Sequence, residues 1–268
     1  MQRGKPFTRY RIVALTISIL LLSACGANHK QPRQDRQITN ETIAHLKVPK
    51  LLQRGTRGNC GPTAAAMVIG AYSNTSDLKA LRSLRDRMGA WSYDNFAMRR
   101  IKLPGVRGGM TPKSVLIEIL NHHGSGLNFG AFAPHRDLEK VSVRVAEAEA
   151  LEKLKTAISG QKPVLALVQS GILWPGSSES LHWVVVTGIS ETDITINDPA
   201  DGEQDTFAIG DFLKGWRLNP FFRTLPFIHS YSAIVADTPI PHADTPEMEQ
   251  ELVAQATPLP GGNAATIP

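Results

Sequence analysis

The stretch Gln53-Arg54-Gly55-Thr56-Arg57-Gly58-Asn59-Cys60-Gly61-Pro62-Thr63 places a cysteine at the start of a predicted helix. Gly61 lets another segment approach closely, and Pro62 has its φ angle pre-set for the first helical turn. Apolar side chains then recur on one helical face, at Ala64, Met67, Val68 and Ala71. The sulfur of Cys60 would therefore lie at the positive end of the helix dipole, a position that lowers the pKa of a thiol and favours the nucleophilic thiolate.

The other cysteine of the chain, Cys25, ends a segment with the features of a signal peptide. Four cationic residues precede the apolar stretch 12–22, which is too short to span a bilayer, and small residues follow in Leu22-Ser23-Ala24-Cys25. This pattern resembles the lipobox of bacterial lipoproteins, which implies removal of residues 1–24 and acylation of the Cys25 sulfur. Cys60 would then be the only free thiol. The alternative is an ordinary secretory signal followed by a disulfide between Cys25 and Cys60.

Lipidation would also fix the location of the protein. Each buried methylene of an acyl chain contributes about 0.8 kcal/mol, so several chains together hold a protein at a membrane surface. Gly26 rather than an aspartate follows Cys25. We therefore expect a lipid-anchored protein of the bacterial cell envelope, at the outer membrane and facing the periplasm if the host is diderm.

The composition favours a single domain beyond that anchor. The chain has 268 residues, 42% of them hydrophobic, and no second apolar run approaches the ~18 residues of a bilayer span. Its net charge is +5, but four positive charges lie in the signal and leave +1, so we expect no nucleic-acid partner. The segment 47–113 holds thirteen Lys or Arg against three Asp or Glu, and 114–268 holds nine against nineteen. Two facing lobes of opposite charge would explain this asymmetry, as would a basic lobe that meets an anionic partner.

Apolar periodicity predicts an α+β domain over residues 47–236, with helices first and a sheet second. Helices are predicted at 61–72, at 77–88, from Thr111 as N-cap to Gly124, and at 151–158. Strands are predicted at 163–168, 183–189, 193–197 and 231–236. Residues 25–46 are polar and are predicted to form a tether. The acidic segment 237–268 has six prolines in 32 residues and is predicted to be a disordered tail.

Three further residues can join the cysteine in one site. His182 begins the apolar run Trp183-Val184-Val185-Val186, a buried strand that places its imidazole at the end of a sheet. A single histidine is more often structural, but here a hairpin turn near 190–192 returns the chain to Asn197 and Asp198 opposite His182. Successive strand residues point to opposite faces, so only one of the two can orient the imidazole; we expect Asp198, with Asn197 as the alternative. The Gln53 amide and the backbone N–H of the cysteine could both donate to a developing oxyanion.

Together these segments resemble the papain-like cysteine peptidases related to the double-glycine leader peptidases of bacteriocin exporters. In order, they are Gln53, Cys60-Gly61-Pro62-Thr63-Ala64-Ala65-Ala66-Met67, His182-Trp183-Val184-Val185-Val186-Thr187-Gly188 and Asn197-Asp198-Pro199-Ala200-Asp201-Gly202. The resemblance covers about residues 50–216. It implies a papain-like fold, a helical lobe followed by an antiparallel sheet lobe, and a thiol peptidase without metal or other cofactor. It also implies Cys60 as nucleophile, His182 as base and acid, Asp198 as orienting residue and Gln53 in the oxyanion hole, acting on a peptide or protein through a thioester.

The same sequence allows other interpretations. A non-catalytic lipoprotein could keep the fold and bind peptides or another envelope protein. A thiol amidohydrolase or transferase could act on peptidoglycan stem peptides or glutamine side chains. His122 and His123 end a predicted helix, where they would complement its dipole rather than hold a metal.

The acidic tail has a feature of its own. A predicted short helix at 245–256 precedes Leu259-Pro260-Gly261-Gly262, which resembles a double-glycine leader. The tail could therefore occupy the cleft as a pseudosubstrate or be cut after Gly262. The alternative is a solvated tail, which Pro258 and Pro260 favour because they interrupt the helix before the glycines.

Overall fold

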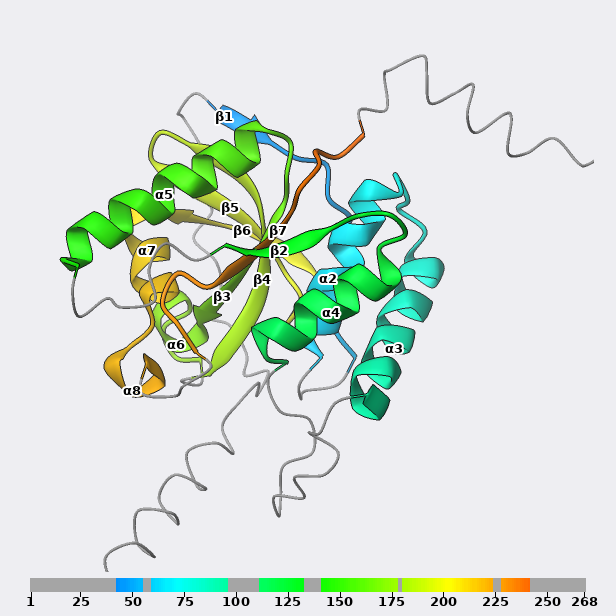
Figure 1. Cartoon of the computed structure of the whole chain (residues 1–268). Coiled ribbons are helices and arrows are strands. Elements are labelled where there is room, and N and C mark those ends of the chain that lie inside the picture. Colours follow the sequence, from blue (N-terminus) through cyan, green and yellow to red (C-terminus); the bar gives the residue numbers. More distant parts are fainter. Residues whose placement is uncertain are drawn as a thin grey trace, which may run out of the picture.

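The computed structural model describes residues 42–54, 59–95, 111–132, 141–177, 180–223 and 228–241. The predicted signal, Cys25 and the segment from residue 242 to the C-terminus, with Gly261 and Gly262, lie outside the described residues. Figure 1 shows helices α2, α3 and α4 grouped on one side of the molecule and the strands with helices α5 to α8 on the other. The predicted α+β class, a helical lobe followed by an antiparallel sheet lobe, is confirmed.

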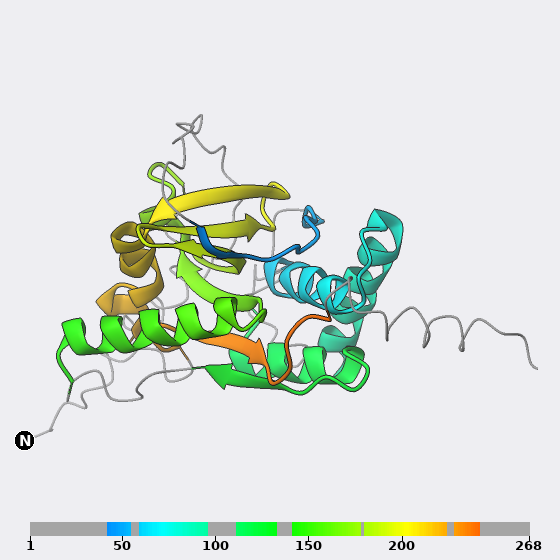
Figure 2. The same cartoon turned by 90° about the horizontal axis from the view of Figure 1, so that it is seen from above.

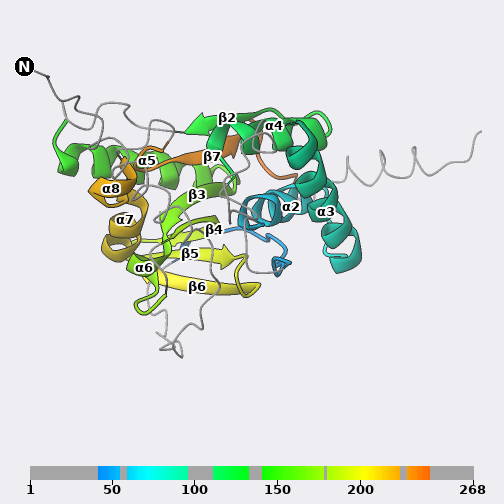
Figure 3. The ribbon, with the colours of Figure 1, turned by 90° about the horizontal axis from the view of Figure 1, so that it is seen from below.

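The helical lobe is built around α2 (Cys60–Tyr72), with α3 (Leu78–Asn95) and α4 (Lys113–His123) packed against it. Every residue of α2 is buried, not only the predicted apolar face. Small side chains make this possible because neighbours can approach the backbone closely: a Cβ at Gly61 would lie 2.8 Å from the Thr111 Cβ, and one at Gly70 would lie 2.6 Å from Leu81. A helix that is apolar on all sides belongs in a core, and α2 lies between the other helices and the sheet (Figures 2 and 3).

The sheet has seven strands, and all its strand pairs are antiparallel. The strands are β1 (Thr42–His45), β2 (Phe129–Phe132), β3 (Val164–Gln169), β4 (Leu181–Ser190), β5 (Asp193–Asp198), β6 (Glu203–Ala208) and β7 (Ala233–Ala236). Their order is β2-β7-β3-β4-β5-β6, with β1 paired to β4. Strands β3, β4 and β5 are buried along their whole length, which explains the continuous apolar runs within β3 and β4. The end of β4 that carries His182 thus lies in the core of the molecule.

The remaining helices lie on the sheet lobe. They are α5 (Val143–Ser159), α6 (Ser170–Leu173), α7 (Ile209–Arg217) and α8 (Pro220–Arg223). Helix α5 begins where the Ser142 hydroxyl accepts a hydrogen bond from the Val145 N–H, and it contacts β1, β3 and β4. Helix α7 contacts β3, β5 and β6. Within the described residues, no helix combines the length and the apolar character needed to cross a bilayer.

The helices and strands predicted between residues 61 and 236 are present, and the short helix predicted at 245–256 lies outside the described residues. The domain extends past both predicted boundaries. Residues 42–45, assigned to the tether, form β1, and the Leu46 that follows is buried. At the other end, the Asp237 N–H donates to the Asn128 carbonyl and the buried Ile240 donates its N–H to Gln161. Both segments are short, and they are ordered by backbone hydrogen bonds to residues that are distant in sequence, which local patterns do not show.

Candidate active site

Cys60 is the first residue of α2, as predicted, and its side chain is fully buried. The side chain of Asn59, at the N-cap position, does not cap the helix; its Nδ2 donates to the Arg54 carbonyl at 2.6 Å. The positive end of the helix dipole therefore faces the sulfur without a competing side-chain oxygen from Asn59. This environment stabilises a thiolate relative to a thiol.

His182 and Asp198 form a hydrogen-bonded pair. Asp198 Oδ1 lies 2.7 Å from His182 Nε2 and also accepts the Ala200 N–H at 2.7 Å, and the carboxylate is fully buried. The register pairs Val185 with Asn197, which places Asp198 opposite Val184, two positions from His182. The hairpin predicted from sequence therefore brings the two side chains together.

Asn197, the alternative orienting residue, points away from the imidazole. Its Nδ2 donates to the Val48 carbonyl at 3.0 Å, and its Oδ1 accepts from Gln204 Nε2 at 3.2 Å. This follows from the pleat of β5, because adjacent residues face opposite sides of the strand. Asp198 is thus the member of the pair that the structure brings to the imidazole.

The imidazole of His182 also hydrogen bonds with the Cys60 side chain. Since Nε2 contacts Asp198, Nδ1 is the ring nitrogen left to face the sulfur. Burial of the imidazole lowers its pKa, but the charge and hydrogen bond of Asp198, together with the interaction with Cys60, outweigh burial and raise the pKa of His182 to about 10. The ring is therefore protonated at neutral pH, and an imidazolium beside Cys60 favours a thiolate–imidazolium pair.

Gln53 lies between the two lobes. Its backbone N–H donates to the Pro199 carbonyl at 2.8 Å, directly after Asp198, and the residue is 7% exposed. The side-chain Oε1 is buried and has no hydrogen-bond partner among the described residues. An incompletely satisfied buried amide costs stability, which is a reason to look for its use in binding or chemistry.

Two residues near His182 were not predicted from the sequence. Trp174, at the end of α6, packs edge-to-face against His182 with ring centroids 6.0 Å apart, and its Nε1 donates to Asp205 Oδ2 at 2.9 Å. Asp205 comes from β6, a strand that was not predicted. The folded sheet brings Asp205 to Trp174, and the sequence around either residue does not indicate this contact. Trp174 thus packs against the His182 ring, and Asp205 holds the indole by its hydrogen bond.

Among the described residues, one group of acidic side chains could face a cation: one oxygen from each of Asp198, Asp201 and Asp205 lies within 4.8 Å of the others. Each of these carboxylates already accepts a hydrogen bond within the protein, that of Asp201 from the Glu203 N–H. Asp198 Oδ1 accepts from His182 and Ala200, and Asp205 Oδ2 accepts from Trp174. Their arrangement supports the imidazole, and none of the histidines belongs to such a group in the described residues.

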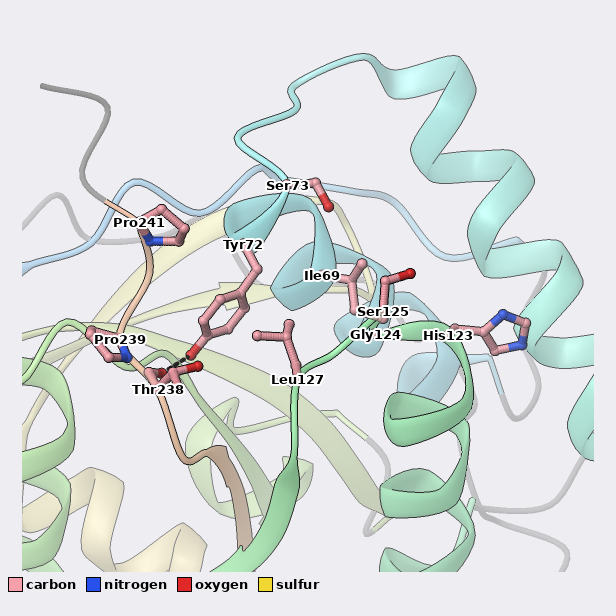
Figure 4. A pocket seen from close by; sticks show the side chains of 10 residues that line it. All are labelled: Ile69, Tyr72, Ser73, His123, Gly124, Ser125, Leu127, Thr238, Pro239 and Pro241. Atoms are coloured by element: carbon pink, nitrogen blue, oxygen red, sulfur yellow. Dashed lines mark hydrogen bonds between the residues drawn. The ribbon is translucent and has the colours of Figure 1, made fainter. Parts of the chain in front are cut away.

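A separate pocket of about 320 Å³ lies at the other end of α2 (Figure 4). Tyr72 lines it and donates its hydroxyl hydrogen to the Thr238 carbonyl at 2.8 Å. His123 also lines it; burial, then His122 and Arg87, lower the pKa of His123. Ile69 is the residue of α2 that lines the pocket nearest to Cys60 along the chain, and the rise of the helix separates the two by about 13 Å, so the pocket is not part of the candidate active site.

The predicted dipole role for the two histidines at the end of α4 does not describe their main contacts. His122 stacks on Trp91 with ring centroids 4.7 Å apart, and the His123 ring is edge-on to both. A lowered pKa leaves His123 neutral at neutral pH, so it adds no charge to complement the dipole. These rings therefore join α4 to α3.

Comparisons with known proteins identify the family of the chain. The profile of the Peptidase C39-like family matches residues 45–220. Among solved structures, a C39-like peptidase from Bacillus anthracis is 14% identical, with 75% of this chain and 100% of that chain covered and a TM-score of 0.44. The Pseudomonas avirulence protein AvrPphB is 10% identical, with 66% and 89% covered and a TM-score of 0.35. No curated protein sequence matches the chain. Because the family match spans more than half of the 268 residues, the chain belongs to the Peptidase C39-like family.

Proposed function

We propose that the protein is a thiol peptidase in which Cys60, His182 and Asp198 act as a catalytic triad. The observation that carries this proposal is the continuous chain of contacts at the start of α2: the Cys60 thiol to the His182 ring, and His182 Nε2 to Asp198 Oδ1 at 2.7 Å. A nucleophile, a base and an orienting carboxylate in this order are the parts that acyl transfer requires. Membership of a peptidase family makes a peptide or protein the substrate.

In the first half of the reaction, the Cys60 thiolate attacks the carbonyl carbon of the scissile amide. The carbonyl π electrons move to oxygen, and the resulting oxyanion accepts hydrogen bonds from the Cys60 N–H and the Gln53 side-chain amide. The His182 imidazolium gives its proton to the amide nitrogen, the C–N bond breaks, and the amine leaves. A thioester on Cys60 and a neutral imidazole remain.

In the second half, His182 takes a proton from water as the water oxygen attacks the thioester carbonyl. The C–S bond breaks, the carboxylic acid leaves, and Cys60 returns as a thiolate beside the imidazolium. Asp198 holds the ring in one orientation through both halves and keeps its charge throughout.

The reactivity of Cys60 tests this proposal without knowledge of the substrate. Iodoacetamide should alkylate Cys60 at a pH of about 5 to 6, well below the ordinary thiol pKa of about 8.5. The reason is that an imidazolium and a helix N-terminus keep the sulfur ionised at such a pH. Mass spectrometry of the Cys60 peptide across pH measures the rate.

His182→Ala is the matched control, because it removes the imidazolium and leaves α2 in place. Its alkylation rate in the acidic range should fall by about tenfold or more, since a thiolate fraction drops tenfold for each pH unit below the thiol pKa. If wild-type Cys60 reacts only near the ordinary thiol pKa, the thiolate–imidazolium pair and the triad are wrong.

We further propose that a lipid on Cys25 anchors the peptidase to the bacterial cell envelope, on the basis of the lipobox-like sequence alone. Cells grown with labelled palmitate should incorporate the label into the wild-type protein and not into Cys25→Ser, whose signal should also stay uncleaved. Cys60→Ala is the control and should keep the label. An unlabelled wild type would instead indicate an ordinary secretory signal.

A further inference from the structure

One peptide unit, the amide that joins Leu52 to Gln53, is held from both lobes. Its carbonyl oxygen accepts a hydrogen bond at 2.8 Å from Nη1 of Arg85, on α3. Its N–H donates at 2.8 Å to the carbonyl of Pro199, just after β5. The oxygen and the hydrogen of a planar trans amide point in opposite directions, so these two bonds fix the plane from opposite edges.

The next residue along the segment is fixed too. The Arg54 carbonyl accepts from Asn59 Nδ2 at 2.6 Å, and Asn59 directly precedes Cys60. The Leu52 and Arg54 carbonyls and the Gln53 N–H are thus bound by residues of three different segments, which lie on α3, before α2 and after β5. This arrangement sets the backbone of Gln53 and hence the direction in which its side chain leaves the chain.

Arg85 is an unusual residue to find in this position. It is a charged side chain with only 7% exposure, while Leu52, whose carbonyl it binds, has a side chain that is 51% exposed. Its Nε binds Asp86 Oδ1 at 2.9 Å, so its charge is paired. Burial of an arginine stem and its head group costs free energy, and the contact made in return is to the peptide that carries Gln53.

We infer that Arg85 is a positioning residue for the oxyanion hole, which acts by fixing the peptide plane before Gln53. The inference rests on the proposed function, because it concerns the group that would stabilise the oxyanion. Arg85 does not reach the sulfur or the imidazole through any described contact, and its effect is confined to the step in which negative charge develops on the carbonyl oxygen.

Two reagents that both react with the Cys60 thiolate separate this role from general damage. Acylation by p-nitrophenyl acetate passes through a tetrahedral oxyanion, whereas alkylation by iodoacetamide displaces iodide and forms none. In the full-length protein, Arg85→Met should lower the rate of Cys60-dependent p-nitrophenol release by about tenfold. Its rate of alkylation by iodoacetamide should stay within about twofold of the wild-type rate. The background of the acylation assay is the rate of Cys60→Ala.

Three further variants complete the experiment. Arg82→Met removes an exposed arginine from the same helix and should change neither rate. Arg85→Lys keeps a cationic donor and should recover most of the acylation rate; it also serves if Arg85→Met does not fold. Gln53→Ala should lower acylation by about 10²-fold, and adding Arg85→Met to it should cost less than about twofold more, because the two residues act through one hydrogen bond to the oxyanion.

The possible results have distinct meanings. If Arg85→Met is acylated at the wild-type rate, or if its acylation and alkylation rates fall equally, the positioning role is wrong and the proposed triad is unaffected. A full tenfold loss on top of Gln53→Ala would mean that Arg85 does not act through Gln53. A wild-type protein that reacts with neither reagent at mildly acidic pH would refute the proposed function itself.

Discussion

Replacement of Cys60 by alanine should lower peptide-bond hydrolysis by on the order of 10³-fold or more, because without the sulfur no thioester forms and the reaction has only binding and oxyanion stabilisation left. His182→Ala should cost about as much, since the thiolate then loses its imidazolium and the leaving amine its proton donor. The double variant should be no slower than either single one, because the two residues act as a unit. Initial rates of p-nitrophenyl acetate hydrolysis by the wild type and the three variants compare their acyl-transfer steps.

Peptide substrates for the same comparison can be captured with the inactive protein. Cys60→Ala keeps the fold of α2 and should retain peptides from envelope extracts that the wild type then cleaves. Cys25→Ser is the matched control: it removes the other cysteine of the chain and should hydrolyse these peptides at the wild-type rate. Full activity in Cys60→Ala would rule out a Cys60 nucleophile, and capture without cleavage by the wild type would favour a peptide-binding role.

The elements that sequence predicted best are those that bury long apolar runs. Strands β3 and β4 are buried along their whole length, so every residue from Val164 to Val168 is apolar and no alternation is needed. Helix α2 was found from its cysteine, proline and apolar spacing, although its burial on all faces was not foreseen. In these segments local preference and tertiary packing favour the same structure.

The missed elements are short and depend on distant partners. Strand β1 has one large apolar residue, Ile43, which is 46% exposed, and it is ordered by pairing with β4. Strand β6 begins with exposed polar residues and is held by β5. Helix α7 contains Gly210 and Gly215, which lower helix propensity, yet it buries Phe212 and Trp216. In these elements, pairing and burial in the folded protein determine the secondary structure, and the intrinsic propensities of the residues do not.

The residues of the candidate site also fall into two groups, those that local sequence patterns predict and those that they do not. Each triad residue lies next to a pattern that the sequence shows clearly. Cys60 is at the start of a helix, His182 is at the start of an apolar strand, and Asp198 is at the end of a hairpin. The choice of Asp198 over Asn197 needed the direction of the β5 side chains, which sequence left open between two neighbours. Trp174 packs on His182, eight positions along the chain, but its hydrogen bond to Asp205 and that of Arg85 to Leu52 join residues 31 or more positions apart. The sequence near each of these residues does not indicate its partner.

Asp198→Asn should lower kcat/KM by about 10²-fold and should also move the alkaline limb of its pH profile. The direction of this shift follows from which residue donates the proton. In the proposed mechanism the imidazolium of His182 is the proton donor, so the rate should decline as pH rises through the pKa of His182. Burial lowers that pKa and the charge of Asp198 is the largest influence that raises it, to about 10 in the wild type. Asparagine removes the charge but keeps an oxygen that can accept from Nε2, so the limb should shift to lower pH while the ring stays oriented.

Asn197→Ala is the control that separates charge from local structure. It removes hydrogen bonds to Val48 and Gln204 from the same strand, one residue away, but it removes no charge and no contact with the imidazole. Its alkaline limb should therefore remain near the wild-type pH, even if the protein melts at a lower temperature. If Asn197→Ala moves the limb and Asp198→Asn does not, Asp198 cannot be the residue that sets the proton affinity of His182. A shift in Asp198→Asn alone would tie the 2.7 Å contact between His182 and Asp198 to catalysis, because the loss of a purely structural hydrogen bond changes stability without changing the pH at which the proton leaves.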